Sequence, residues 1–305
     1  MNYKNLLLKL LATLSVSIFI SSGASAGTVW LVSADTAATN HDTSVLVLLG
    51  QRDILVGDDQ AVGGWSNVTS TPGAQLGIIG ALINSSRESK QEKFQESLVA
   101  PIRSALSDMN GDDLALKATK IALQKVNWLN SQPVTSAKDD SRKIQSDFLD
   151  QIHGDQAVFI HYVYFFDPDF QALHAKILIE IAKKSTPMGG RPEDRFKTRY
   201  LACRQTIDIS VPLTDVKKSN DVSNAKIWAA NNGDLARKAL ISAFDSAAIY
   251  IPRMINMNAS ELSSLYDRKL PKMKYDGDWG QKIEDTDTRT VMWAERFVII
   301  PKIGI

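Results

Sequence analysis

The stretch VFIHYVYFFDPDFQALHAKILIEI, residues 158–181, decides the fold. Its first part, 158–166, is rich in β-branched and aromatic residues, and 172–181 alternates between apolar and other side chains. Between them, Asp-Pro-Asp-Phe at 167–170 has the composition of a turn, because Asp and Pro favour turn geometry. The pattern predicts a long β-hairpin over 157–181.

The predicted register divides the side chains of this hairpin between two faces. With a four-residue turn, Phe166 pairs with Gln171 and His161 pairs with Lys176. One face is then apolar throughout and should meet the core, since an antiparallel sheet commonly buries only one side. The other face carries His161, His174 and Glu180 among its residues.

The remaining strong patterns extend this hairpin into an α+β fold. A third strand over 198–211 alternates and places Cys203 in the inward row. Residues 85–108 and 224–251 have helical periodicity, the second with a predicted interruption at 231–233. We therefore expect a mostly antiparallel sheet, hairpin 157–181 plus strand 198–211, packed against helices.

The predicted domain organisation has three parts: a signal peptide over 1–26, an α/β domain over 27–255, and a polar extension over 256–305 ending in a strand. Within the domain, 45–49 is expected to be an early strand and 132–140 a polar connector. In the extension, 256–287 is expected to be an extended connection and 291–300 the last strand.

The amino-terminal segment is typical of a cleavable secretory signal. Lys4 and Lys9 precede an apolar run over 10–20, and small residues end in Ala24-Ser25-Ala26. The alternative is a membrane anchor, but Lys9 shortens the apolar run below the roughly 20 residues that a spanning helix needs. We expect cleavage near Ala26, a mature chain without a transmembrane segment, and a periplasmic or secreted location.

Composition narrows the classes of partner. The chain has 35 basic and 34 acidic residues, and the signal removes two of the lysines, so the mature protein is close to neutral. The sequence has no dense run of basic residues, so its charge gives no reason to expect nucleic-acid binding. With one cysteine the chain forms no internal disulfide, and no sequence pattern implies a cofactor.

Known catalytic motifs are not found in the sequence. It has neither a Gly-rich phosphate loop of standard spacing nor a nucleophile elbow nor a zinc-binding pattern. One histidine pair remains as a candidate metal site: in the predicted register His161 and His174 lie diagonally on one face, about 7 Å apart. The alternative is that both are ordinary half-exposed histidines of a sheet surface.

A row of glycines is the candidate partner-binding feature. Gly73, Gly77 and Gly80 recur at helical spacing after a long polar loop, and small residues on one helical face let another backbone come close. Two interpretations are open: the start of a buried helix, or a docking face for a partner or a second copy of the chain.

Three segments, 20 residues in all, carry a loose resemblance to uncharacterised exported proteins of Gram-negative bacteria: 77–83, 162–170 and Trp228 to Asn231. The arrangement is also similar to envelope-assembly proteins whose α/β domain resembles the amino-terminal domain of TolB. Many of those are lipoproteins, whereas Gly27 stands here where a lipidation cysteine would be. The resemblance implies no catalytic residues.

Taken together, these features lead to two hypotheses. The first is a non-catalytic binding or assembly module of the cell envelope, with a protein partner or self-association. The alternative is an exported hydrolase whose active site is dispersed along the chain, since catalytic triads assemble from distant residues.

Overall fold

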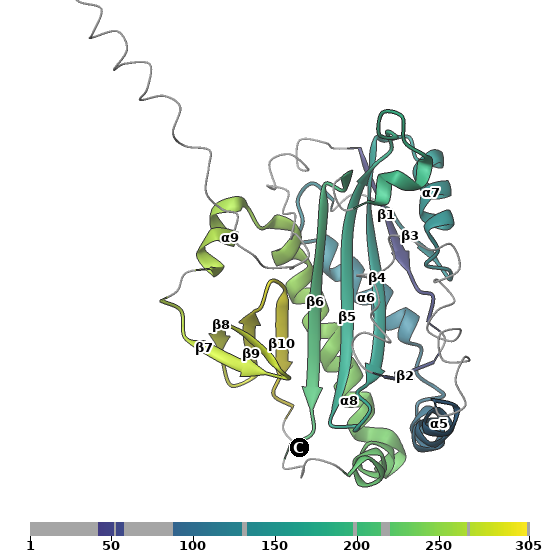
Figure 1. Ribbon diagram of the computed structural model, residues 1–305, viewed down its shortest axis with the longest axis vertical. Coiled ribbons are helices and arrows are strands. Elements are labelled where there is room, and N and C mark those ends of the chain that lie inside the picture. Colours follow the sequence, from purple (N-terminus) through teal and green to yellow (C-terminus); the bar gives the residue numbers. More distant parts are fainter. Residues whose placement is uncertain are drawn as a thin grey trace, which may run out of the picture.

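The structure is a computed structural model that describes residues 42–51, 53–57, 88–129, 133–197, 200–214, 220–266 and 269–303. The described residues form a ten-stranded sheet in the order β3-β1-β4-β5-β6-β10-β9-β8-β7, with β2 paired to β4. Helices α6 and α8 lie behind the sheet in Figure 1. The α+β fold with a mostly antiparallel sheet is confirmed.

The central hairpin consists of β4 (Gln156–Phe166) and β5 (Ala172–Lys183). The predicted register was wrong by two residues, because Phe166 pairs with Leu173 and not with Gln171. The turn is longer since Phe170 adopts a φ of 54° and is fully buried, while the Asp167 carboxylate accepts hydrogen bonds from the backbone N–H groups of Gln171 and Ala172. A two-residue shift leaves every side chain on its predicted face.

The third strand, β6 (Cys203–Pro212), lies antiparallel to β5 as predicted, although it begins later than expected. Cys203 pairs with Ile181 and is buried in the main core, which confirms its inward position.

Three short strands complete the other half of the sheet with parallel pairings. They are β1 (Thr43–Leu48), between β3 and β4, β2 (Leu55–Val56), beside β4, and β3 (Val134–Ala137), at the edge. The prediction of a polar connector over 132–140 was wrong at β3, because β1 offers a free edge to Val134 and Thr135. Such pairing partners are distant in sequence and leave no local signal.

One face of the sheet is covered by α5 (Glu88–Ala105), α6 (Gly111–Leu123) and α8 (Asp221–Asn256). The predicted interruption of α8 is confirmed, since Asn231, Asn232 and Gly233 have positive φ. Beyond the break, α8 packs on β5, β6 and β10 with small side chains that allow a close approach. These buried residues are Ala236, Ala239, Ala243 and Ala247.

Among the described residues, helices cover the opposite face at one end only. There α7 (Arg142–Gln151) and the 3-10 helix η3 (Pro192–Phe196) enclose a second apolar cluster. Its members include Leu46, Leu48, Leu149, Phe159 and Phe196. Further along this face the side chains become charged.

The carboxyl-terminal region departs from the prediction. Where an extended connection and one strand were expected, the structure has α9 (Ala259–Leu265), β7 (Lys272–Tyr275), β8 (Asp278–Asp285), β9 (Arg289–Trp293) and β10 (Phe297–Pro301). The predicted last strand is two strands, because Glu295 reverses the chain at a φ of 58°. Parallel pairing of β10 with β6 joins this region to the sheet.

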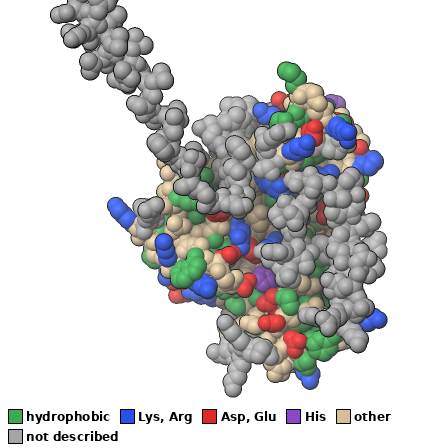
Figure 2. Space-filling model, in the orientation of Figure 1, with side chains coloured by type: hydrophobic (Ala, Val, Ile, Leu, Met, Phe, Trp, Pro, Cys, Tyr) green, Lys and Arg blue, Asp and Glu red, His purple; other side chains and the backbone are tan. Residues whose placement is uncertain are grey.

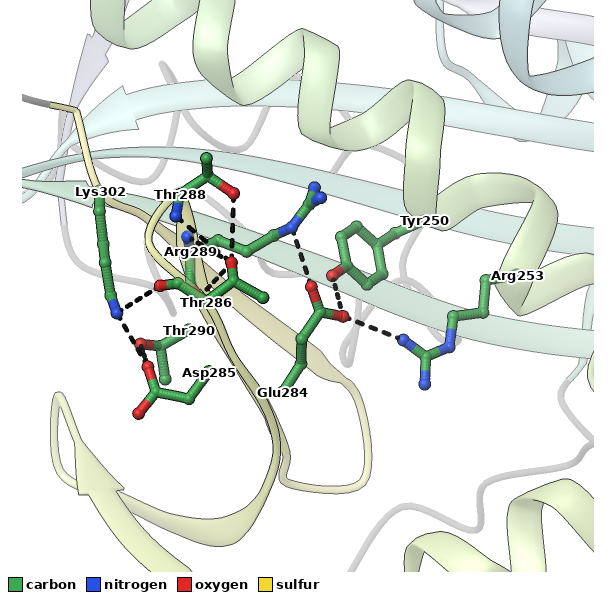
Figure 3. A network of polar contacts seen from close by, with 9 residues as sticks. All are labelled: Tyr250, Arg253, Glu284, Asp285, Thr286, Thr288, Arg289, Thr290 and Lys302. Atoms are coloured by element: carbon green, nitrogen blue, oxygen red, sulfur yellow. Dashed lines mark hydrogen bonds and ion pairs between the residues drawn. The ribbon is translucent and has the colours of Figure 1, made fainter.

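Polar contacts hold the β8–β9 turn against α8 (Figure 3). The Tyr250 hydroxyl donates to Glu284 Oε2 at 2.9 Å, and Arg289 Nε donates to Glu284 Oε1 at 3.0 Å. Arg253 lies 3.5 Å from the same carboxylate. Lys302 donates to Asp285 at 2.8 Å and closes the turn from the other side. The carboxyl-terminal strands are thereby attached to the main helix.

No helix within the described ranges combines the length and the apolarity that crossing a membrane requires. The proposed signal segment, residues 1–26, lies outside the described residues.

Candidate functional site on the charged face of the sheet

A belt of charged side chains crosses the sheet face opposite α6 and α8, and charged and histidine side chains gather there over β5 and β6 in Figure 2. Strand alternation places six residues in it, which we call the charged belt: His161, His174, Lys176, Glu180, Arg204 and Asp208. All but Arg204 are buried, Glu180 completely. Burying a charge costs several kcal/mol unless it is paired, so the partners of these groups decide what the belt can do.

Glu180 is the centre of the first half of the belt. Arg142, the first residue of α7, donates hydrogen bonds to both carboxylate oxygens of Glu180, at 2.6 and 3.0 Å. His161 Nε2 lies 3.3 Å from Oε2, and Arg204 Nε lies 3.6 Å from Oε1. Burial alone would raise the pKa of Glu180, but Arg142 and His161 outweigh it and hold that pKa well below its usual range. Glu180 therefore stays ionised.

Asp208 is the centre of the second half, with longer contacts. Lys176 Nζ and Arg296 Nε each lie 3.6 Å from Oδ2, and His174 Nδ1 lies 3.9 Å from Oδ1. Burial acts to raise the pKa of Asp208, but His174 and Lys176 lower it to about 2. Burial also acts against the charged form of His174, yet Asp208 raises its pKa above the usual value. Asp278, the first residue of β8, forms an ion pair with Arg296.

A hydroxyl pair joins the carboxyl-terminal strands to this half of the belt. Ser210 Oγ and Tyr275 Oη are 2.8 Å apart, and burial raises the pKa of Tyr275 to about 12. Ser210 also pairs across the sheet with His174. The His174 ring stacks on Phe165 with 5.0 Å between centroids. A serine, a histidine and an aspartate thus share one region of the face.

The contacts of the charged belt compensate buried charges and stabilise the fold, and they do not prepare a group for proton transfer. A general acid needs a pKa near the working pH, whereas Glu180 and Asp208 are both shifted away from neutrality. A serine nucleophile needs a hydrogen bond to its base, whereas the hydrogen bond of Ser210 goes to Tyr275. The charged belt therefore resembles an internal ion network.

The structure separates the two histidines of the predicted metal site. His161 pairs with Leu178, four residues along β5 from His174, which corresponds to about 13 Å at about 3.3 Å per residue. The predicted spacing of about 7 Å was wrong, because it depended on the shorter turn. Each ring faces its own carboxylate. Among the described residues no group of three or more metal-binding side chains is found.

The predicted partner-binding glycines, Gly73, Gly77 and Gly80, lie outside the described residues. Their role as a docking face stays a prediction.

Sequence reasoning missed the cations that complete the belt. Alternation placed Arg204 and Asp208 on the polar side of the third strand, and matching their charges against Glu180 and Lys176 of the hairpin could have predicted the cross-strand pairs. Arg142 and Arg296 had no comparable signal, because they reach the belt from a helix and a turn outside the hairpin.

Comparisons with known proteins give little guidance. No family model matches the chain, and no curated protein matches it. Among solved structures, a hypothetical protein of Chlamydia trachomatis aligns with 68% of this chain and 98% of that chain, at 7% sequence identity and a TM-score of 0.21. A TM-score this low supports no argument, so the resemblance to exported and envelope-assembly proteins stays a prediction.

Proposed function

We propose that this chain is an exported protein of the cell envelope that binds a protein partner and has no catalytic activity of its own. Three features support the proposal: the secretory pattern of residues 1–26, the lack of a catalytic motif in the sequence, and the engagement of both belt carboxylates by cations. The observation that carries it is the outer face of the β7–β8 hairpin.

This hairpin presents an exposed tryptophan between lysines. Trp279 is 68% exposed, the largest exposed fraction of any aromatic side chain among the described residues. Its cross-strand partner is Lys274, and Lys272 lies two residues further along the same face. Met273 and Tyr275 point to the opposite side and pack against the sheet. Figure 2 shows hydrophobic and basic side chains side by side in this region.

The chemistry of this face indicates a protein partner with an acidic surface. Tryptophan is enriched among the residues that dominate binding energy, and an exposed indole gains most when a partner covers it. The lysines favour a surface of opposite charge. They also line the outer edge of β7, where lysine opposes unspecific strand pairing. The partner is therefore expected to cover the hairpin face.

The test is an affinity capture from detergent-solubilised envelope with residues 27–305 as bait, followed by titration of the purified partner. We expect Trp279→Ala, or Lys272→Glu with Lys274→Glu, to weaken binding at least tenfold, and added salt to weaken binding to the wild type. Met188→Ala is the matched control, because Met188 is fully exposed in the loop before η3. A partner held equally well by the Trp279→Ala protein would contradict the proposal.

The predicted glycine row is tested in the same capture. A Gly77→Leu bait that loses the partner while Trp279→Ala retains it would move the binding surface to residues 73–80.

An exported hydrolase is the second candidate, favoured by the pairing of Ser210 with His174 beside Asp208. It requires Ser210 to exchange its contact with Tyr275 for one with His174. Screens with ester, peptide and phosphoester substrates test it. Turnover by the wild type that is abolished by both Ser210→Ala and His174→Gln, and retained by Tyr275→Phe, would replace the binding proposal with this one.

A further inference from the structure

A cavity of about 380 Å³ opens on the helical side of the sheet, near the carboxyl end of β4. Its wall includes Ile54, Arg103, Leu106, Gly111, Tyr164 and Leu240. The volume lies within the range of small-molecule sites in proteins. In sheets with parallel strands, ligands commonly bind beyond the carboxyl ends, and β1, β2 and β4 are parallel here.

Tyr164 supplies a hydroxyl that has no hydrogen-bond partner among the described residues. The residue is 8% exposed and lines the cavity, and its hydroxyl makes no hydrogen bond within the described part of the chain. Tyr162, two residues earlier on the same face, is more deeply buried, and its hydroxyl lies 2.8 Å from Thr119 Oγ1. Because Tyr164 lines the cavity and its hydroxyl is not used within the fold, the hydroxyl is available to a ligand.

Gly111 leaves space for that hydroxyl. A Cβ at Gly111 would lie 2.4 Å from Tyr164 Oη, closer than any side chain tolerates. Any larger residue at this first position of α6 would force the Tyr164 ring to move. Glycine therefore keeps the Tyr164 hydroxyl at the cavity wall.

The charges around the cavity select a cation over an anion. The first N–H groups of α6 cannot hold an anion, because the Asn110 side chain accepts from Asp112 and Asp113. Arg103 is engaged with Glu96 and with the Ile54 carbonyl oxygen. On the acidic side, Asp108 pairs with Arg237, and Asp112 pairs with Lys138.

Asp53 differs from Asp108 and Asp112 because no cation compensates its charge among the described residues. It lines the cavity and has no ion pair with any residue of the described ranges. Burial raises the pKa of Tyr164, and the nearby charge of Asp53 raises it further. An ammonium group between the two would compensate the Asp53 carboxylate and donate a hydrogen bond to the Tyr164 oxygen.

We propose that this cavity binds a small organic cation with a primary ammonium group on an aliphatic body. The ammonium group donates hydrogen bonds to the Asp53 carboxylate and the Tyr164 hydroxyl, and the aliphatic body lies on Ile54, Leu106 and Leu240. The inference is independent of the partner surface on the β7–β8 hairpin, since the two sites share no residue.

The test is an NMR titration of the mature chain, residues 27–305, with three six-carbon probes: n-hexylammonium, 1-hexanol and hexanoate. We expect saturable binding of n-hexylammonium, at least tenfold weaker binding of the alcohol, and no saturable binding of hexanoate. The alcohol keeps the apolar contacts and loses the charge, so it isolates the contribution of Asp53.

Variants locate the site. Tyr164→Phe and Asp53→Asn should each weaken n-hexylammonium binding by about tenfold, the loss expected for one hydrogen bond to a charged group. Tyr162→Phe is the matched control and should leave the affinity unchanged. Neither Tyr164→Phe nor Asp53→Asn removes a side-chain hydrogen bond or ion pair within the described residues, so both should fold, as unfolding curves can verify. Equal binding of hexanoate, no binding of any probe, or an unchanged affinity of Tyr164→Phe would overturn the proposal.

Discussion

At the residue scale, Glu180 shows how strongly one buried charge determines its surroundings. Two guanidinium groups and an imidazole converge on a carboxylate with no exposed surface, and Arg142 also lies over the Phe196 ring at 4.9 Å. Replacing one partner of such a network leaves the others buried and uncompensated.

We therefore predict that Glu180→Gln lowers the free energy of unfolding by about 3–5 kcal/mol. Urea denaturation measures this change. Asp147→Asn is the control: its ion pair with Lys143 is largely exposed, so the loss should stay below about 0.5 kcal/mol. Similar losses for the two variants would show that the Glu180 network contributes no more than a surface pair.

The two tyrosines of β4 give a second prediction at this scale. Tyr162→Phe leaves the Thr119 hydroxyl buried without its partner, which should cost about 1–3 kcal/mol. Tyr164→Phe removes a hydroxyl that has no hydrogen bond within the described part of the chain, so the free energy of unfolding should change by less than about 0.5 kcal/mol. Guanidinium denaturation of both variants makes the comparison. Equal losses would mean that the Tyr164 hydroxyl is hydrogen-bonded.

At the scale of elements, the charged belt connects α7, the central hairpin, β6 and the β9–β10 turn through charge. Arg142 links α7 to β5, and Arg296 links the β9–β10 turn to β6. Strands that were predicted separately thus share two buried carboxylates. Protonation of a belt carboxylate should therefore destabilise all of these elements at the same time.

Acid should weaken the fold through Asp208. Its pKa is about 2 in the folded chain and 3.8 when unperturbed, so its contribution is present above pH 3.8 and is lost as the pH falls towards 2. The loss amounts to about 2 kcal/mol. His174, whose pKa is raised, acts in the opposite sense: its contribution is present below pH 6.5 and is lost as the pH rises through its folded value.

The measurement is the free energy of unfolding between pH 2 and 5 for the wild type and Asp208→Asn. The variant should be less stable at pH 5, because Lys176 and Arg296 lose their shared carboxylate, and should lose about 2 kcal/mol less on acidification. Parallel curves for the two proteins would show that Asp208 does not titrate as proposed.

At the scale of the whole molecule, the proposed export and the proposed partner binding rest on opposite ends of the chain. The secretory pattern lies in residues 1–26, and the exposed Trp279 lies on β8, which the Glu284 contacts with Tyr250 and Arg253 fix to α8. The hairpin that we propose as the binding surface is therefore held on the folded body, and Tyr275 links it to the charged belt through Ser210.

Expression of the full chain in a Gram-negative host should give a mature protein that begins at Gly27 and is recovered with the periplasm. Mass spectrometry of the intact protein measures this. Ala26→Arg should block cleavage and leave the precursor in the membrane fraction, because the cleavage site requires small residues. Recovery of the uncleaved wild type from the cytoplasm would contradict the prediction of export.

The sequence by itself determined the features that depend on neighbouring residues. Alternation placed His161, Glu180 and Cys203 on their correct faces, and Asn231 to Gly233 marked the break in α8, because strand period and backbone preference are local properties.

Only the tertiary structure decided the features that depend on distant partners. The hairpin register shifted by two residues when Phe170 packed into the core, and β3 formed because β1 needed an edge partner. Likewise, Arg142 reaches Glu180 only because α7 docks on that end of the sheet, and the cavity at Tyr164 exists only where α6 begins against β4. Such contacts join residues far apart in the chain, so no local pattern records them.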